Sequence, residues 1–232
     1  MMRQGDMKMA VVAFDAYGTL FDISDLADVA RPLFADQPAA QAFCQRWRQL
    51  HLEFAWQSAL AEQYRDFDQL AKQSLYAALA EHEMVRTEAD AVAQQLLKHM
   101  QKVPVYPDVK PTLHQLDNYK TAVLSNGTLR SLQALAVAND VLFSFDFILS
   151  VDPIRTYKPS RKAYALVQSA FGCEKREVLF VSSNSWDIAG AKAYGFRTCW
   201  CNRSQVPYIS PGQKPDHVIA TLAELPAILS ES

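Results

Sequence analysis

The sequence predicts an α/β protein in which a doubly wound, Rossmann-like parallel sheet carries an inserted all-helical cap. Short apolar segments alternate with helical patterns from about residue 120 to the C-terminus, and one further apolar segment lies near the N-terminus. The long stretch between them, 24–103, has helical periodicity and hardly any strand signal. Strands that alternate with helices pair in parallel through right-handed crossovers, with helices on both faces of the sheet.

The first expected element is a strand over 8–15, KMAVVAFD, which is short, mostly apolar and contains two β-branched valines. A lone strand among helices would leave its backbone hydrogen-bonding groups unpaired. We therefore expect this strand to join the sheet that the later strands form. The helical stretch is then an insertion after the first strand.

The inserted stretch is expected to be helical because its apolar residues recur at helical spacing. Phe43, Trp47, Leu50 and Phe54 fall at positions i, i+4, i+7 and i+11, along one stripe of an amphipathic helix. Two further helices are expected, over 66–82 and 88–102. The segment VPVYPDVKP then interrupts the pattern with three prolines. We predict a core domain of 1–22 and 105–232 and a helical cap domain of 23–104.

After this segment the chain alternates regularly between the two kinds of element. Strands are expected over 121–126, 145–152, 177–183, 197–203 and 216–220. Helices are expected over 129–139, 160–171, 186–194 and from about 221. Ligands of such sheets bind at the carboxyl ends of the strands, so the residues at those ends are the candidates for function.

The composition argues against several classes of protein. The chain has 232 residues, 50% of them hydrophobic, with 23 Lys plus Arg against 25 Asp plus Glu. This balance shows no basic face of the kind that binds nucleic acid, and no apolar run approaches the roughly 20 residues of a membrane span. The N-terminus, MMRQGDMKMA, lacks the apolar region of a secretory signal. We expect a cytoplasmic protein that binds neither nucleic acid nor membrane.

The four cysteines and five histidines predict no metal or redox site. Cys199 and Cys201 alternate onto one face of an expected strand, but no further ligands stand at a recognisable spacing. The histidines form no HExxH-like pattern. We interpret the thiols as buried, and we expect no bound metal.

Polar residues gather where four of the expected strands end. They are Asp15 after the first strand, Ser125 and Asn126 after the second, Lys158 and Tyr164 after the third, and Ser182, Ser183, Asn184 and Asp187 after the fourth. Each could have an ordinary role as a helix cap, a turn residue or a solvated side chain. Four such clusters at one edge of a sheet nevertheless predict a single site.

Four segments carry a resemblance that covers nearly the whole chain: FDAYGTLFD, VLSNGT, YKPSRKAY and FVSSNSWD. They resemble the four motifs of the haloacid dehalogenase superfamily and, more narrowly, those of the L-2-haloacid dehalogenases, also called type II. The resemblance extends to WRQLHLEFAW in the expected cap. It implies an (S)-2-haloacid dehalogenase that needs no cofactor, with a small 2-haloalkanoic acid and halide as its partners, and it implies a homodimer.

Two positions favour cleavage of a carbon–halogen bond over cleavage of a phosphate ester. Most members of the superfamily are magnesium-dependent phosphatases, which carry a second acid in the first motif and a further acid in the fourth. Here these positions hold Tyr17 and Ser183. A magnesium site requires oxygen ligands that usually include carboxylates, and their loss should weaken it severely. Halide leaves as a stable anion, so it needs neither a metal nor a general acid.

The resemblance makes Asp15 the nucleophile, which would displace halide from C2 with inversion and form an aspartyl ester that water then hydrolyses to the (R)-2-hydroxy acid. Lys158 would keep this carboxylate ionised in apolar surroundings, where burial would otherwise raise its pKa. Asp187, Asn184 and Ser182 would position or activate the hydrolytic water.

The remaining roles also follow from the resemblance. The substrate carboxylate would bind backbone N–H groups of the Asp15 loop, including Ala16, and the hydroxyl of Ser125. The departing halide would meet Arg48, assisted by Asn126. Apolar or aromatic lining is implied for Tyr17, Phe67 and Trp186, and supporting roles for Thr19 and Tyr164. By helical spacing alone Arg48 would count as a solvated arginine, like its neighbour Arg46, and the motif match reverses that interpretation.

Three alternatives stay open at this point. The first is a magnesium-dependent phosphatase of the same superfamily, against which the two lost acids argue. The second is a non-catalytic member that binds an anion or a protein partner through its cap, although every motif residue with a catalytic role is present. The third is a dehalogenating enzyme whose physiological substrate is not a haloacid.

Overall fold

The computed structural model describes residues 10–82 and 86–230, so the first two residues of the strand expected at 8–15 lie outside the described part. Within it, six strands form one sheet in the order β3-β2-β1-β4-β5-β6, and each neighbouring pair is parallel. They are β1 (Val11–Phe14), β2 (Lys120–Ser125), β3 (Phe147–Ser150), β4 (Val178–Ser182), β5 (Arg197–Cys201) and β6 (His217–Ile219). The predicted doubly wound α/β fold is confirmed.

The chain order reverses beside β1, which lies in the middle of the sheet. Phe14 at its end is opposite Val123 of β2 on one side and Val181 of β4 on the other. From β2 the chain leads outward to β3, and from β4 it leads outward to β5 and β6 in the opposite direction. The carboxyl ends of β1, β2 and β4 therefore meet at the point where open α/β sheets bind their ligands.

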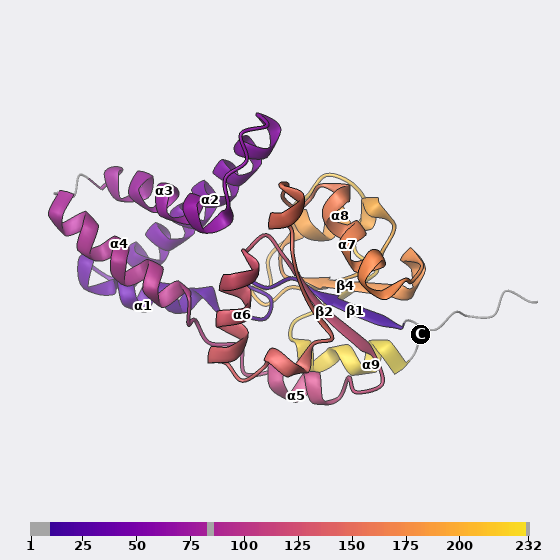
Figure 1. The fold of residues 1–232 in the computed structure, drawn as a ribbon. Helices are drawn as coiled ribbons and strands as arrows, with labels where there is room; N and C mark the ends of the chain where they lie inside the picture. Colours follow the sequence, from indigo (N-terminus) through magenta and orange to yellow (C-terminus); the bar gives the residue numbers. More distant parts are fainter. Residues whose placement is uncertain (1–9, 83–85, 231–232) are drawn as a thin grey trace, which may run out of the picture.

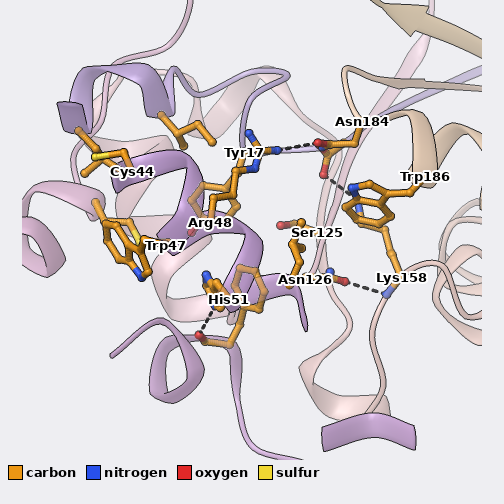
Figure 2. Close-up of a pocket in the computed structure, with 16 residues that line it drawn as sticks. Tyr17, Cys44, Trp47, Arg48, His51, Ser125, Asn126, Lys158, Asn184 and Trp186 are labelled. Atoms are coloured by element: carbon orange, nitrogen blue, oxygen red, sulfur yellow. Dashed lines mark hydrogen bonds and ion pairs between the residues drawn. The ribbon is translucent and has the colours of Figure 1, made fainter. Parts of the chain in front are cut away.

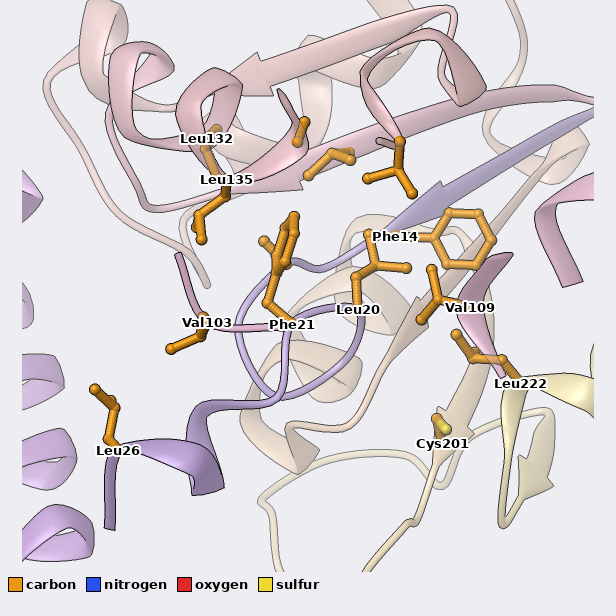
Figure 3. Packing of buried hydrophobic residues seen from close by; sticks show 14 of the residues in the cluster. Phe14, Leu20, Phe21, Leu26, Val103, Val109, Leu132, Leu135, Cys201 and Leu222 are labelled. Carbon is orange, nitrogen blue, oxygen red and sulfur yellow. The ribbon is translucent and has the colours of Figure 1, made fainter. Parts of the chain in front are cut away.

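Helices cover both faces of the sheet (Figure 1). One face carries α5 (Val109–His114), α6 (Leu129–Ala138) and α9 (Leu225–Ser230), and the other carries α7 (Arg161–Phe171) and α8 (Ser185–Tyr194). Side chains alternate along β1, so Val12 and Phe14 pack on the side of α5, α6 and α9, whereas Val11 and Ala13 pack on the side of α7 and α8. The core is thus divided into two hydrophobic clusters, of which the one that contains Phe14 is the first. Figure 3 shows part of the first cluster.

Between β1 and β2 the chain forms the helices that the sequence predicts as an insertion. We call Ile23–Met100 the helical insertion; its α-helices are α1 (Leu26–Ala30), α2 (Gln37–Leu60), α3 (Phe67–Ala80) and α4 (Arg86–Met100). Figure 1 shows it beside the sheet rather than on either face. Asp36 and Asp66 cap α2 and α3, since each carboxylate accepts the backbone N–H of the third residue of its helix, at 2.8 Å.

The apolar stripe of α2 is buried much as the sequence predicts. Phe43, Trp47 and Leu50 are buried, and Phe54 is half-buried. The indole N–H of Trp47 donates to the carbonyl of Ala71 in α3, at 3.0 Å. α2 and α3 are therefore fixed to each other by both apolar packing and a buried hydrogen bond.

The two segments that join the insertion to the sheet lie side by side. The N–H of Asp22 donates to the carbonyl of Pro104 at 2.7 Å, and the N–H of Tyr106 donates to the carbonyl of Leu20 at 2.9 Å. The chain therefore leaves and re-enters the core at one junction, a few residues after the end of β1.

Some elements differ from the prediction for identifiable reasons. α5 contains Pro111, which we expected to interrupt the helical pattern. Pro111 stands in the first turn of α5, where a backbone N–H has no intrahelical partner, so the helix loses no hydrogen bond. α1 has five residues, too few to show a period. β3 is shorter than the expected strand because the chain turns into a 3-10 helix at Asp152–Ile154. None of the described helices combines the length and apolarity that a bilayer crossing requires.

Candidate active site

A pocket of about 70 Å³ lies between the strand ends and the helical insertion (Figure 2). The core contributes its polar lining, which is Asp15, Ser125, Asn126, Lys158 and Asn184. Arg48 comes from α2, and aromatic walls come from Tyr17, Phe67 and Trp186. The pocket thus brings together nine of the residues that the sequence predicts for the site, taken from elements far apart in the chain.

Asp15 follows β1 directly and is held by several donors. Asp15 is 5% exposed. Its Oδ1 accepts from Lys158 Nζ at 2.7 Å, and its Oδ2 accepts from Thr19 Oγ1 at 2.9 Å and from Asn184 Nδ2 at 2.8 Å. Ser182 Oγ approaches the same oxygen at 3.4 Å. These donors fix the carboxylate at the end of β1, where it lines the pocket.

Lys158 is fully buried and lies between two carboxylates. Its Nζ donates to Asp15 Oδ1 and to Asp187 Oδ2, each at 2.7 Å, and to the carbonyl oxygen of Leu124 at 2.9 Å. Burial acts to lower the pKa of this ammonium, but the two carboxylates outweigh burial and the pKa is raised. The lysine is therefore a fixed cation between the two carboxyl groups.

Asp187 lies behind this lysine in the first turn of α8 and is fully buried. Tyr164 OH donates to its Oδ1 at 2.7 Å, and Ser182 Oγ donates to its Oδ2 at 3.2 Å. Burial raises the pKa of Asp187 to about 6, an effect that Lys158 opposes and Asp15 adds to. Asp187 can therefore exchange a proton near neutral pH, whereas burial and Asp187 raise the pKa of Tyr164, which stays a donor.

The loop after β1 positions Thr19 between two strand ends. Thr19 Oγ1 donates to Asp15 and accepts from the N–H of Ser183 at 2.8 Å, so one hydroxyl ties the end of β1 to the loop after β4. Gly18 in this loop has φ +83°, and a Cβ there would lie 3.1 Å from Arg48 Nη1. A glycine is required both by the backbone conformation and by the approach of the guanidinium.

Arg48 reaches the site from the helical insertion and bonds to a residue of the loop after β4. Arg48 Nη2 donates to Asn184 Oδ1 at 2.6 Å (Figure 2). Asn126, which the resemblance places with Arg48 beside the halide, lines the same pocket, and its side-chain oxygen accepts the N–H of Lys158 at 2.8 Å. Burial lowers the pKa of Arg48 while Asp15 opposes that effect, and a guanidinium stays charged in either case. Arg46 points elsewhere and pairs with Glu81 at 2.8 Å on the exposed face of the insertion.

Ala16 and Ser125 stand where the sequence predicts an anion site. Ala16 is fully buried in the first hydrophobic cluster, so only its backbone can serve a ligand. Ser125 Oγ accepts the N–H of Gly127 at 3.1 Å, which fixes the hydroxyl at the end of β2. Ser125 lines the pocket, and Ala16 lies between Asp15 and Tyr17, which both line it.

The aromatic walls are packed against one another across the boundary between core and insertion. The rings of Tyr17 and Phe67 have centroids 6.2 Å apart, and those of Trp56 and Trp186 lie 5.5 Å apart, edge to face. Trp56 also donates its indole N–H to the carbonyl of Lys158, at 2.9 Å. Burial, then Asp68 and Asp15, raise the pKa of Tyr17, which keeps its proton. The pocket is therefore mostly apolar apart from the cluster at its base.

Sequence reasoning missed much of this apolar lining and one polar residue. The apolar residues are Ile23, Leu26, Cys44, Trp47, Leu52 and Met100. The polar one is His51, whose ring stacks on Phe67 with centroids 3.7 Å apart and whose Nε2 contacts the carbonyl of Phe67 at 2.8 Å. Burial lowers the pKa of His51 to about 4, so the ring is neutral and Nε2 carries the proton. Its spacing of three residues from Arg48, on the same helix face, was the signal available.

Comparison with known proteins places this geometry in a family. A family model described as haloacid dehalogenase-like hydrolase matches residues 9–195. The haloacetate dehalogenase H-2 of Moraxella sp. (strain B) is 32% identical over 217 residues, which cover 93% of this chain and 95% of that protein. An (S)-2-haloacid dehalogenase of Xanthobacter autotrophicus is 38% identical over 185 residues, which cover 80% of this chain and 72% of that protein.

A solved structure gives the same result in three dimensions. The L-2-haloacid dehalogenase from Xanthobacter autotrophicus with chloropropionic acid covalently bound matches with a TM-score of 0.85 and 32% identity, over 97% of this chain and 99% of that one. The sequence motifs, the sheet order and these matches agree with one another. The chain belongs to the haloacid dehalogenase-like hydrolase family and, within it, to the L-2-haloacid dehalogenases.

Proposed function

We propose that this protein is a hydrolytic (S)-2-haloacid dehalogenase, which converts (S)-2-haloacids to (R)-2-hydroxy acids through an ester on Asp15. The observation that carries the proposal is the Asp15 carboxylate: it is buried, held by Lys158, Thr19 and Asn184, and faces a small, mostly apolar pocket. The relative with chloropropionic acid covalently bound supports a covalent route.

In the first step an oxygen of Asp15 attacks C2 of the substrate from the side opposite the halogen. A carbon–oxygen bond forms, the carbon–halogen bond breaks, and the halide leaves with the bonding electron pair, so that C2 is inverted. Arg48 supplies the positive charge for the departing halide. The substrate carboxylate is held by Ser125 and by N–H groups of the Asp15 loop, including Ala16, and Asn126 stands beside them.

In the second step water attacks Cγ of Asp15 and gives a proton to Asp187, whose raised pKa suits it to a base near neutral pH. The donors to the oxygen of Asp15 that carries no ester then face the oxyanion of the tetrahedral intermediate. They are Thr19 and Asn184 if Oδ1 carries the ester, or Lys158 if Oδ2 does, and they stabilise charge that develops in the transition state. The bond from Cγ to the product oxygen breaks, and that oxygen takes up the proton held by Asp187. The second proton of the water passes to solvent, Asp15 is regenerated, and the hydroxy acid leaves with an oxygen that came from Asp15.

The chief competing function is a magnesium-dependent phosphatase. Lys158 Nζ, 2.7 Å from both carboxylates, supplies a cation between Asp15 and Asp187 from the protein itself. Tyr17 and Ser183 stand where the phosphatases have acids, and among the described residues no group of three or more His, Cys, Asp or Glu is placed to hold a metal. We expect turnover to persist after dialysis against chelator, and an absolute requirement for magnesium would overturn the choice.

We also propose that the helical insertion acts as the cap of the site, with domains of 1–22 plus 105–232 and of 23–104, in a cytoplasmic homodimer. The cap is supported by Arg48 and Phe67 of the insertion, which line the pocket together with core residues, and by the bond from Trp56 to the carbonyl of Lys158. Light scattering on the eluting protein should give about twice the 26.1 kDa mass of one chain. A mass of one chain at micromolar concentration would refute the dimer.

Release of chloride from L-2-chloropropionate tests the proposed function directly. We expect stoichiometric chloride and (R)-lactate, with the D enantiomer unreacted because its halogen would point away from Arg48. Release of chloride from chloroacetate tests whether the shortest haloacid is also a substrate. If neither haloacid releases halide, while the protein binds them, the non-catalytic alternative is favoured and the proposal fails.

A further inference from the structure

A second cavity, of about 140 Å³, shares Arg48 and Asn184 with the active-site pocket. It extends from these two residues along the loop after β5, whose Ser204 and Val206 also line it. Ser204 is exposed and Val206 is 51% exposed, so the cavity reaches the surface of the protein. Arg48 therefore stands between the reaction pocket and a second space that opens to solvent.

The two spaces differ in polarity and in charge. The active-site pocket is mostly apolar above the carboxylate cluster, whereas the second cavity is mostly polar. Its lining includes two guanidinium groups, Arg48 and Arg203, and the other lining residues are neutral. Two of those could titrate, but burial raises the pKa of Cys201 to about 11 and that of Tyr106 to about 12.

Carboxylates outside the lining reduce this positive charge. Asp108 pairs with Arg203 through two hydrogen bonds, at 2.8 and 3.0 Å. Arg203 also donates to the carbonyl of Thr19 at 2.9 Å, and its guanidinium lies 3.9 Å from the centre of the Tyr106 ring. Two more carboxylates act on the lining through their charge, Asp22 on Tyr106 and Asp15 on Arg48. Among the described residues Arg203 is thus paired with a carboxylate, whereas Arg48 donates its hydrogen bond to the neutral Asn184.

We propose that this second cavity is the exit for the halide, which moves from the reaction pocket past Arg48 and Asn184 to the surface at Ser204 and Val206. The inference rests on the proposed function. A halide released into the first pocket is an anion among apolar side chains, where charge is costly to leave unpaired. Moving across Arg48 keeps it beside a guanidinium until it reaches water, while the hydroxy acid stays esterified to Asp15.

The position of a bound halide tests the cavity without any turnover. We would soak crystals of the protein in bromide and locate bromide by anomalous scattering. We expect a bromide within contact distance of Arg48 on the side lined by Arg203 and Asn202. Bromide found solely in the reaction pocket, or solely on the outer surface, would overturn the proposal.

The path is tested by filling its mouth. In Val206→Trp we expect ester formation on Asp15, measured by acid quench and mass spectrometry, to proceed at the wild-type rate. Free halide, followed by a halide-sensitive fluorophore, should appear at least several-fold later than the ester. Ile209→Trp is the matched control, because Ile209 lies on the same loop, is 79% exposed and does not line the cavity. Equal halide release in the two variants would show that halide leaves by another route.

Charge at the mouth gives a third test. Ser204→Glu should weaken inhibition by added bromide and Ser204→Lys should strengthen it, each by about two- to fivefold, as for an exposed charge pair. Both effects should shrink at high ionic strength. Changes of the same sign in both variants, or none, would contradict an anion path there. Failure of the proposed function would look different, since the wild-type protein would then release no halide at all.

Discussion

The two sides of the active site are built in different ways. On the core side, Asp15, Lys158 and Asp187 are fixed by several short hydrogen bonds each, all within one rigid sheet edge. On the insertion side, Arg48 is held at the site through one side-chain hydrogen bond among the described residues, to Asn184. The difference separates the two tasks: the nucleophile is organised before substrate binds, while the group that receives the halide depends on how insertion and core meet.

Removal of the nucleophile should have the largest effect, and it changes the core side of the active site alone. Asp15→Asn should lower kcat by at least about 10⁴-fold, because an amide cannot displace halide and such groups act as a unit. Turnover of L-2-chloropropionate measures it, and circular dichroism checks the fold. Asp22→Asn is the control, since Asp22 caps the following 3-10 helix and lies outside the pocket; it should stay near wild type. Comparable losses in both variants would mean that folding, not chemistry, is affected.

Loss of Arg48 should come next and should break the insertion side. Its charge stabilises the departing halide, so Arg48→Ala should lower kcat by about 10² to 10³ with little change in KM. Arg48→Lys should recover part of the rate, because an ammonium lacks the planar donor fork. The loss should appear in the halide burst, before ester hydrolysis.

The neighbour of Arg48 on the same helix provides its control. Arg46 forms an exposed pair with Glu81, which contributes little to stability. Arg46→Ala should therefore be nearly silent in kcat and in thermal stability. Should the two alanine variants prove equally active, Arg48 would be a surface residue and the proposed halide group would be wrong.

The pH dependence should sharpen the description of the core side. Ester hydrolysis requires Asp187 as its base, and burial raises the pKa of Asp187 to about 6. Activity should therefore be present above this pH and fall as the pH drops through it, in kcat, because Asp187 acts after the halide has left. In Asp187→Asn the fall of activity should move to lower pH, and ester hydrolysis should slow. If the pH of the fall is unchanged, a group other than Asp187 controls it.

The smallest effect should come from a contact that joins the two sides. Trp56 of α2 donates to the carbonyl of Lys158, at 2.9 Å. Trp56→Phe removes this bond and keeps most of the ring, so we expect the free energy of unfolding to fall by about 1 kcal/mol and kcat to change by less than tenfold. Denaturant unfolding and steady-state kinetics measure the two. A loss as large as that of Arg48→Ala would mean that the core side also depends on the insertion.

The residues themselves explain how much the sequence could predict. Asp15, Ser125 and Asn184 follow apolar runs, so their place at the sheet edge is readable from pattern, and the motif resemblance added the role of Lys158. The bond from Arg48 to Asn184 was not readable, since it joins residues far apart in sequence and depends on how α2 packs. Lining residues such as Ile23 and Met100 were missed because single apolar residues carry no signal that separates a pocket wall from a core.

The covalent ester on Asp15 is the central claim, and one measurement tests it most directly. A single turnover of L-2-chloropropionate with excess enzyme in heavy-oxygen water should give lactate whose new hydroxyl oxygen is unlabelled, because that oxygen comes from Asp15. The label should appear in the peptide that contains Asp15, by mass spectrometry after digestion. Heavy oxygen found in the lactate hydroxyl, with none in that peptide, would show that water attacks the substrate directly and would contradict the account.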